Sequence, residues 1–243
     1  MKNRIRTPTA ALGIVLLLSS ALCGSAQHSE TIMARRPKAS GGGTPTVNAP
    51  GCSYGTTSAS FSTTGYTFEV VAVTFYPPDG ANTVTDSLGN TLTSLSVYGS
   101  GPATKLTYTT LSSTSGSTTI STTTPSVFCV FLTSGQSGVF DTGTDQGAGN
   151  SVNTCQPSAS SIAPGAGHVV FTALGGSSPT STTTPTIANS GADTYTVASP
   201  FVYFAPGVHF GQAGGYAILT GASNLTWSWT GMGPSNCAEA SFH

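Results

Sequence analysis

Short segments of β-branched and aromatic residues, separated by turn residues, fill the chain from Gly51 onward and constrain its fold more than any other feature. The segment Tyr66–Tyr76 first alternates apolar and polar residues and then becomes apolar on both faces, which is typical of a central strand entering a core. Val127–Leu132 is a second fully apolar run. No segment after Gly51 has a helical apolar period of convincing length. The pattern therefore predicts an all-β fold, and the close spacing of its strands favours an antiparallel, jelly-roll-like β-sandwich.

The first residues have the order of a secretory signal peptide. A basic segment, 2–6, precedes an apolar run over 10–22, and small residues follow up to Ala26, after which we predict cleavage. The run is shorter than the roughly 20 residues that cross a bilayer, which disfavours the alternative of a membrane anchor. A lipoprotein site at Cys23 is disfavoured by Leu22 in front of it. We expect the chain to be secreted, extracellular or on the cell surface, with the periplasm as the alternative and no membrane insertion of the mature chain.

The chain is predicted to have three parts. Residues 1–26 are the signal peptide, residues 27–50 a disordered linker, and residues 51–243 one β-sandwich domain. The linker prediction rests on the absence of an apolar period and on a run of three glycines flanked by prolines.

Four cysteines remain after the predicted cleavage, an even number that indicates two disulfides in an exported chain: Cys52, Cys129, Cys155 and Cys237. Three pairings exist, and the sequence does not separate them. We prefer Cys129 with Cys237 and Cys52 with Cys155, because Cys129 and Cys237 both fall in strand-like runs. A zinc site would need ligand pairs close in sequence, such as C-x-x-C, and the cysteines form none.

Charge is scarce, at 6% of the residues, and unevenly distributed. From Gly51 onward Lys105 is the only lysine or arginine, and seven aspartates and glutamates leave that part with a net charge of −6. A domain with one lysine cannot neutralise a phosphate backbone, so composition excludes nucleic acid as a partner.

Five segments, in this order, resemble a recurrent class of exported bacterial domains: FEVVAVTFY, TVTDSLGNTLTSL, VFCVFLTSG, SIAPGAGHVVFTAL and GGYAILTGASNLTWSWTG. The resemblance covers most of residues 51–243. It implies a β-sandwich in a surface or secreted protein, usually one without an assigned activity. The chain departs from that class in its four cysteines and in Leu92, where an aromatic residue is common.

Two stretches of the domain are faintly alike. Val70–Phe75 and Val169–Leu174 are both apolar runs, and each is followed by similar short threonine-rich segments. The likeness is too loose for the sequence to establish a duplication, although it favours a design with two sheets.

Asp141 and Asp145 are candidate metal ligands, because the segment Asp141–Gly147 can supply oxygen atoms to calcium. A polar loop with ordinary turns is the favoured interpretation. His168, at the start of a predicted strand, is interpreted as a surface residue or as one that supports a functional residue, rather than as a catalytic one, since the histidines have neither H-x-x-x-H nor H-E-x-x-H spacing.

Aromatic residues suggest a ligand surface. Tyr203 and Phe204 belong to a cluster interrupted by proline and glycine, and exposed aromatic faces stack on sugar rings. A second set, Leu225, Trp227 and Trp229, shares one face of a predicted strand, for which core packing is favoured over a sugar-binding platform.

Two glutamates lie within predicted strands, where a carboxylate needs solvent or a partner. Glu69 and Glu239 would be the acid pair of a carboxyl-based hydrolase. No nucleophile motif supports catalysis, and no catalytic residue is assigned. The leading hypothesis is a non-catalytic binding module for glycans or a surface partner. A structural, self-associating cell-envelope or appendage protein is the first alternative, and the hydrolase is the second.

Overall fold

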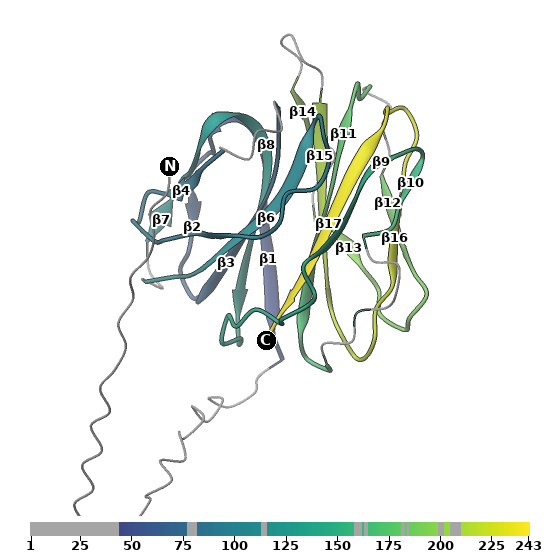
Figure 1. The fold of residues 1–243 in the computed structure, drawn as a ribbon. Helices are drawn as coiled ribbons and strands as arrows, with labels where there is room; N and C mark the ends of the chain where they lie inside the picture. The colour runs from purple at the N-terminus through teal and green to yellow at the C-terminus, as the bar shows by residue number, and fades with distance from the viewer. Residues whose placement is uncertain are drawn as a thin grey trace, which may run out of the picture. The chain divides into compact units, whose positions relative to one another are not determined.

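A computed structural model describes most of the chain after residue 43: residues 44–76, 82–112, 116–157, 162, 165–180, 183, 185–198, 202–204 (backbone only) and 210–243. Within these residues every regular element is a β-strand, and all ladders are antiparallel (Figure 1). The all-β prediction is confirmed. In the described part of the chain no helix is long and apolar enough to span a bilayer.

Two large sheets carry most of the strands. Sheet 1 has the order β1 (Thr46–Thr57), β8 (Ile120–Ser134), β3 (Phe68–Phe75), β6 (Ala103–Thr110) and β5 (Thr93–Ser94), and β4 (Val84–Asp86) also pairs with β8. Sheet 2 has the order β9 (Gln146–Ser151), β17 (Ser235–Phe242), β11 (Val169–Ser177), β15 (Phe210–Ile218) and β13 (Thr196–Val197), and β14 (Val202–Phe204) also pairs with β15.

Two small sheets complete the described strands. One has the order β10 (Thr154–Cys155), β16 (Leu225–Ser228) and β12 (Thr186–Asn189), and the other pairs β2 (Phe61–Ser62) with β7 (Ser117–Thr118).

The two large sheets share one hydrophobic cluster. It takes alternate residues of β3 and β8 from sheet 1 and of β11 and β17 from sheet 2. Aromatic rings meet across it, with centroids 5.2 Å apart for Phe131 and Phe171 and 5.0 Å apart for Phe68 and Phe242. The other face of each central strand is covered too, which explains why β3 is buried along its whole length. The apolar run predicted within Tyr66–Tyr76 is therefore a strand that packs against apolar residues on both of its faces.

The small sheet with β16 covers sheet 2 on its outer side. Trp227 is fully buried in that layer, and its indole Nε1 donates a hydrogen bond of 2.9 Å to Oγ1 of Thr172 in β11. The tryptophan stripe of β16 is core packing, as expected.

The halves of the chain build the two large sheets by the same plan. Strands β1, β8, β3, β6 and β5 lie in the same order in sheet 1 as β9, β17, β11, β15 and β13 in sheet 2. The correspondence extends further: β4 pairs with the first residues of β8, and β12 pairs with β16, which directly precedes β17. The faint sequence likeness is therefore accompanied by a repeated topology (Figure 1).

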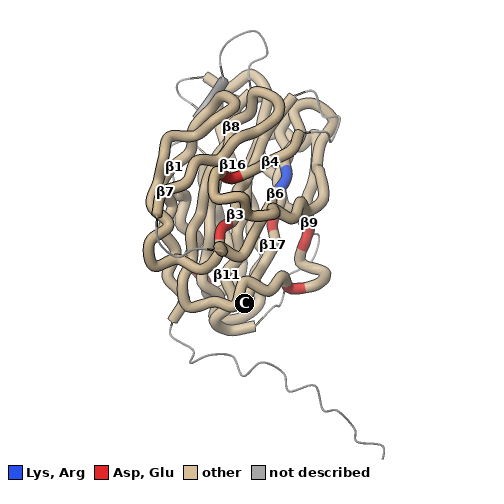
Figure 2. The backbone as a smooth tube through the Cα atoms, turned by 90° about the vertical axis from the view of Figure 1, so that its left-hand side faces the viewer, with Lys and Arg blue, Asp and Glu red and all other residues tan. Residues whose placement is uncertain are grey.

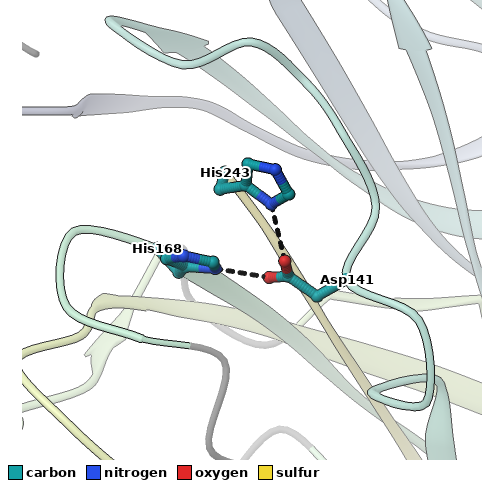
Figure 3. A group of neighbouring side chains, drawn as sticks. All are labelled: Asp141, His168 and His243. Carbon is teal, nitrogen blue, oxygen red and sulfur yellow. Dashed lines mark hydrogen bonds and ion pairs between the residues drawn. The ribbon is translucent and has the colours of Figure 1, made fainter. Parts of the chain in front are cut away.

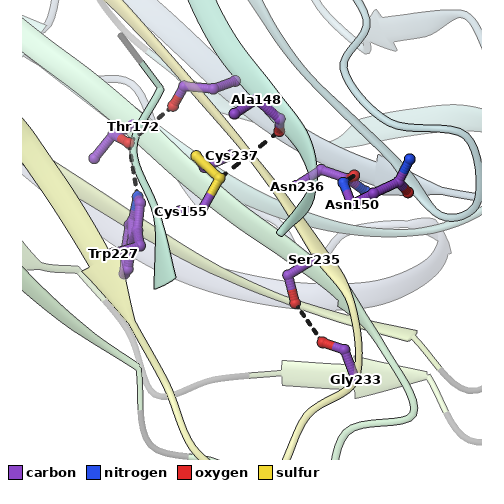
Figure 4. Close-up of a disulfide and its surroundings, with 10 residues drawn as sticks. Ala148, Asn150, Cys155, Thr172, Trp227, Gly233, Ser235, Asn236 and Cys237 are labelled. Carbon is purple, nitrogen blue, oxygen red and sulfur yellow. Dashed lines mark hydrogen bonds between the residues drawn. A yellow bond between two sulfur atoms is a disulfide. The ribbon is translucent and has the colours of Figure 1, made fainter. Parts of the chain in front are cut away.

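The disulfides join Cys52 to Cys129 and Cys155 to Cys237, so the preferred pairing was wrong. Cys52 and Cys129 are direct cross-strand partners in β1 and β8, and Cys155 of β10 reaches β17 (Figure 4). Each disulfide stays within one half of the chain. The preference failed because strand-like character does not reveal which strands are neighbours.

The first described strand begins inside the predicted linker. β1 begins at Thr46, and a register shift lies between Asn48 and Gly51. Pro50 lies at that irregularity in an edge strand, where the missing N–H is tolerated. Residues 1–43, with the predicted signal peptide and most of the predicted linker, lie outside the described residues.

Candidate metal centre

Two histidines lie side by side where β11 and β17 meet at one end of sheet 2. Val169 and Phe242 are cross-strand partners, so His168, which precedes Val169, and His243, which follows Phe242, come next in the ladder. Their ring centroids are 4.9 Å apart. Because Val169 and Phe242 face the shared core, the adjacent histidines face the outer side of the sheet.

The loop after β8 brings an aspartate to the same point. Val139 and His243 exchange two backbone hydrogen bonds of 3.0 Å, and the N–H of Asp141 donates to the carbonyl of Ser241 at 3.0 Å. Thr144 closes the loop, since its N–H donates to the carbonyl of Asp141 at 3.1 Å. Asp141 is therefore fixed through its backbone on both sides.

The carboxylate of Asp141 lies beside both rings and contacts each of them (Figure 3). Its Oδ2 is 2.7 Å from Nδ1 of His168, and its Oδ1 is 2.6 Å from Nδ1 of His243. Ser241 donates a third hydrogen bond, of 2.6 Å, from Oγ to Oδ2. The side chains of Asp141 and His168 are 11% and 20% exposed, whereas that of His243 is 48% exposed. The cluster is thus fixed on one side and open to solvent on the other.

Gly165 sets the orientation of one ring. A Cβ at this position would lie 3.0 Å from Nε2 of His168, and the backbone φ is +130°, which side chains rarely adopt. The Nε2 edge of His168 therefore packs against a glycine, and its Nδ1 edge turns toward Asp141.

Two imidazole nitrogens and a carboxylate oxygen are a donor set for divalent transition metals. The donor atoms of Asp141, His168 and His243 all lie within 4.8 Å of one another, and no other group of three such residues occurs in the described part of the chain. Four tetrahedral ligands of zinc are roughly 3.4 Å apart for metal–ligand bonds of about 2.1 Å. Small side-chain rotations would bring the three donors to that spacing.

The cluster does not form a Ser-His-Asp arrangement at His168. A Ser-His-Asp arrangement places a hydroxyl at the histidine nitrogen opposite the aspartate. In the cluster, Gly165 lies beside Nε2 of His168, and the nearby Ser241 donates to the carboxylate instead. A cavity of about 100 Å³ lies elsewhere, beside β1, and is lined by residues such as Cys52, Phe61 and Val130. It is smaller than the few hundred Å³ of ordinary ligand sites.

The structure separates the two predicted calcium ligands. Asp141 belongs to the histidine cluster, whereas Asp145 accepts hydrogen bonds from the N–H of Ser96 at 2.9 Å and from the hydroxyl of Tyr98 at 3.1 Å. Asp145 thus ties the segment after β5 to the start of β9. A calcium site made by both residues stays a prediction that this geometry does not favour.

Glu69 and Glu239 are not brought together. Glu69 lies on the face of β3 opposite Phe68 and Val70, which belong to the shared core, and Glu239 lies on the face of β17 opposite Ala238. The hydrophobic cluster between the sheets therefore separates them. Neither lines the cavity beside β1.

Tyr203 and Phe204 lie in β14, where they pair with Gly211 and Phe210 of β15. Their side chains lie outside the described residues, so the predicted aromatic ligand surface stays a prediction.

Comparisons with protein-family models, curated proteins and solved structures found no match to this chain.

The histidine cluster was missed in the sequence because its members come from three distant segments. Short-range spacing finds metal sites on one helix or one turn, whereas the register of β11 with β17 brings together residues 75 positions apart. The available signal was the placement of His168 immediately before one predicted strand and of His243 immediately after another.

Proposed function

We propose that the protein is an exported, non-catalytic binding module with a jelly-roll-like β-sandwich fold, and that it binds a divalent transition-metal ion through Asp141, His168 and His243. The sandwich assignment is supported by two sheets that share one core. The signal-peptide pattern and the two disulfides support export, because disulfides persist in oxidising surroundings.

The observation that carries the metal proposal is the convergence of both Nδ1 atoms on one carboxylate. The distances of 2.6 and 2.7 Å mean that an ion displacing the hydrogen-bonded protons would have three protein ligands. Two imidazoles favour zinc-like ions over calcium, which prefers oxygen ligands alone.

The other half of the chain supports a functional role for the histidines. By the repeated topology, Thr67 and Ser134 occupy the positions equivalent to His168 and His243, next to the partners Phe68 and Thr133. In sheet 1 the ladder of β3 and β8 ends at that point without a histidine in either strand. The second sheet therefore does not need its histidines for strand pairing.

Glycans or a surface partner remain the proposed further ligands of the module. Three protein ligands leave at least one coordination position of a zinc-like ion free, on the side where His243 is exposed, and a hydroxyl or carboxylate of a partner can fill it. Self-association as an envelope protein remains a proposal that rests on the Ser/Thr-rich composition. The positions of Glu69 and Glu239 do not favour the hydrolase.

Calorimetric titration of the purified mature domain with Zn²⁺ and Ca²⁺ tests the metal proposal. We expect one Zn²⁺ per chain and no Ca²⁺ binding. Asp141→Asn should weaken Zn²⁺ binding by at least about 10-fold, because it removes the anionic ligand. Asp145→Asn is the matched control and should leave the affinity unchanged, since Asp145 bonds to Ser96 and Tyr98.

A spectroscopic measurement identifies the ligand atoms. The ¹⁵N resonances of the imidazoles should show that Zn²⁺ binds at Nδ1 of both His168 and His243. Equal loss of Zn²⁺ in both aspartate variants, or Nε2 ligation, would refute the assignment of the site.

A further inference from the structure

Two glutamates, Glu69 and Glu239, are buried in the domain interior away from the metal centre. The side chain of Glu69 in β3 is fully buried, and that of Glu239 in β17 is 1% exposed. Each lies beneath the outer layer of its own sheet. An ionised carboxylate in such a place is very costly unless it is paired and hydrogen-bonded.

In the described part of the chain, Glu69 has no partner that would stabilise a charge. Neither of its carboxylate oxygens has a hydrogen bond. Its cross-strand neighbours are Thr109 in β6, whose hydroxyl donates to the carbonyl of Thr110, and the apolar Leu132 in β8. The charged group that acts on it from β4 is Asp86, another acid.

Glu239 is in a similar position in the other sheet. Its Oε2 is buried without a hydrogen bond. Of its cross-strand neighbours, Thr172 donates to the carbonyl of Ala238, and the amide nitrogen of Gln146 donates to Gly143. The titratable groups that it influences are the phenols of Tyr98 and Tyr195, which are acids too.

Among the residues that the structure describes, no lysine or arginine is placed to neutralise either glutamate. Lys105 is the only lysine or arginine beyond residue 38, and its ammonium donates to the carbonyl of Asn82 at 2.5 Å and lies 5.5 Å from the centre of the Phe75 ring. It lies four residues from Thr109 along β6, which is roughly 13 Å at the rise of a strand. The ion pairs of the described residues all involve Asp141 (Figure 2 shows how sparse the charges are).

We propose that Glu69 and Glu239 each carry a proton in the folded domain, so that the fold is a pH-sensitive device that is strongest in acidic surroundings and weakens toward alkaline pH. The geometry supports this, because a neutral carboxyl group loses far less than a carboxylate on leaving water. Burial raises the pKa of both groups to about 8, and Asp86 adds to the increase for Glu69.

The sign of the effect follows from the protons bound in each state. Between pH 4.5 and about 8 each glutamate is protonated in the folded domain and ionised in the unfolded chain. Because the folded state binds more protons there, stability falls as pH rises. The contribution is complete below pH 4.5 and is lost by the time pH has risen through about 8. The unfolding equilibrium constant should rise about 10-fold per pH unit for each group.

Urea unfolding of the mature domain at pH 5, 6 and 7, with a chelator present to keep the metal centre unoccupied, measures this dependence. For the wild type we expect the unfolding constant to increase by about 10⁴-fold from pH 5 to 7, since two groups contribute. Glu69→Gln and Glu239→Gln mimic the protonated side chains, and each should remove about 10²-fold of that increase. Asp145→Asn is the control and should keep the full dependence, since it leaves Glu69 and Glu239 in place.

A direct titration keeps the proposal testable if a glutamine variant does not fold. The ¹³C resonances of the two side-chain carboxyl groups in the folded wild type should stay at their protonated positions at pH 7. Titration of both groups near pH 4.5, or an unfolding constant with the same pH dependence in the glutamine variants as in the wild type, would overturn it.

Discussion

At the scale of single residues, the carboxylate of Asp141 organises the metal centre. It accepts hydrogen bonds at 2.6–2.7 Å from Ser241, His168 and His243, and its backbone is held by Ser241 and Thr144. A carboxylate held in this way needs little reorganisation to bind an ion. Residues that orient metal ligands commonly change affinity by 10–100-fold when they are removed.

Ser241→Ala tests that positioning role. The variant loses the hydrogen bond to Oδ2 of Asp141 but keeps all three metal ligands. We expect Zn²⁺ affinity to fall by about 10-fold, with one ion still bound per chain. Calorimetry against the wild type measures the change. An unchanged affinity would mean that the backbone alone positions Asp141.

At the scale of strands and loops, the sequence predicted which segments form strands better than it predicted which strands pair with one another. The apolar runs in β3, β8 and β11 were recognised from their pattern, because burial on both faces leaves a continuous apolar signal. The start of β1 gives a weaker signal, since Thr46–Pro50 alternates only briefly, with Val47 and Ala49 partly buried against the core at the sheet edge, and nothing in it indicates pairing with β8. The sequence predicted the number of disulfides, but their pairing and the histidine cluster depend on which strands are neighbours and could not be predicted.

The two disulfides offer a test at this scale. They close loops of similar length, with sequence separations of 77 and 82, so chain entropy predicts a similar loss of about 4 kcal/mol of unfolding free energy for each. Cys155 and Cys237 are both buried in the layer around Trp227, whereas Cys52 is partly exposed. Cys155→Ala/Cys237→Ala should therefore cost more than Cys52→Ala/Cys129→Ala, because it removes two buried sulfur atoms, whereas only Cys129 of the other pair is buried.

Urea midpoints of the two double variants, measured at one pH, decide the comparison. A larger loss for the pair between β1 and β8 would show that the edge strand depends on its disulfide more than the core beneath β16 does.

At the scale of the whole domain, the repeated topology separates what the fold requires from what is specific to one half. Each half has a central strand, β3 or β11, between two others. In each half a disulfide is attached to the strand next to the central one, which is β8 in the first half and β17 in the second. The first half has Thr67 and Ser134 where the second has His168 and His243. The fold therefore tolerates different side chains at this point, so the positions are free to carry function.

The equivalence of the two positions can be tested by building a second site. In a His168→Ala/His243→Ala background, Thr67→His and Ser134→His would place two imidazoles side by side beyond the pair Phe68 and Thr133. Cross-strand partners have Cβ atoms about 5 Å apart, which suits two histidine ligands of one ion. We expect Ni²⁺ binding to reappear, but more weakly than at the native centre, because no equivalent of Asp141 supplies an anionic ligand. Calorimetry with Ni²⁺ measures it, and each single histidine variant is the control. If the double variant bound no more Ni²⁺ than the single ones, the side chains at Thr67 and Ser134 would not correspond to the native pair, and the repeat would be limited to the strand order.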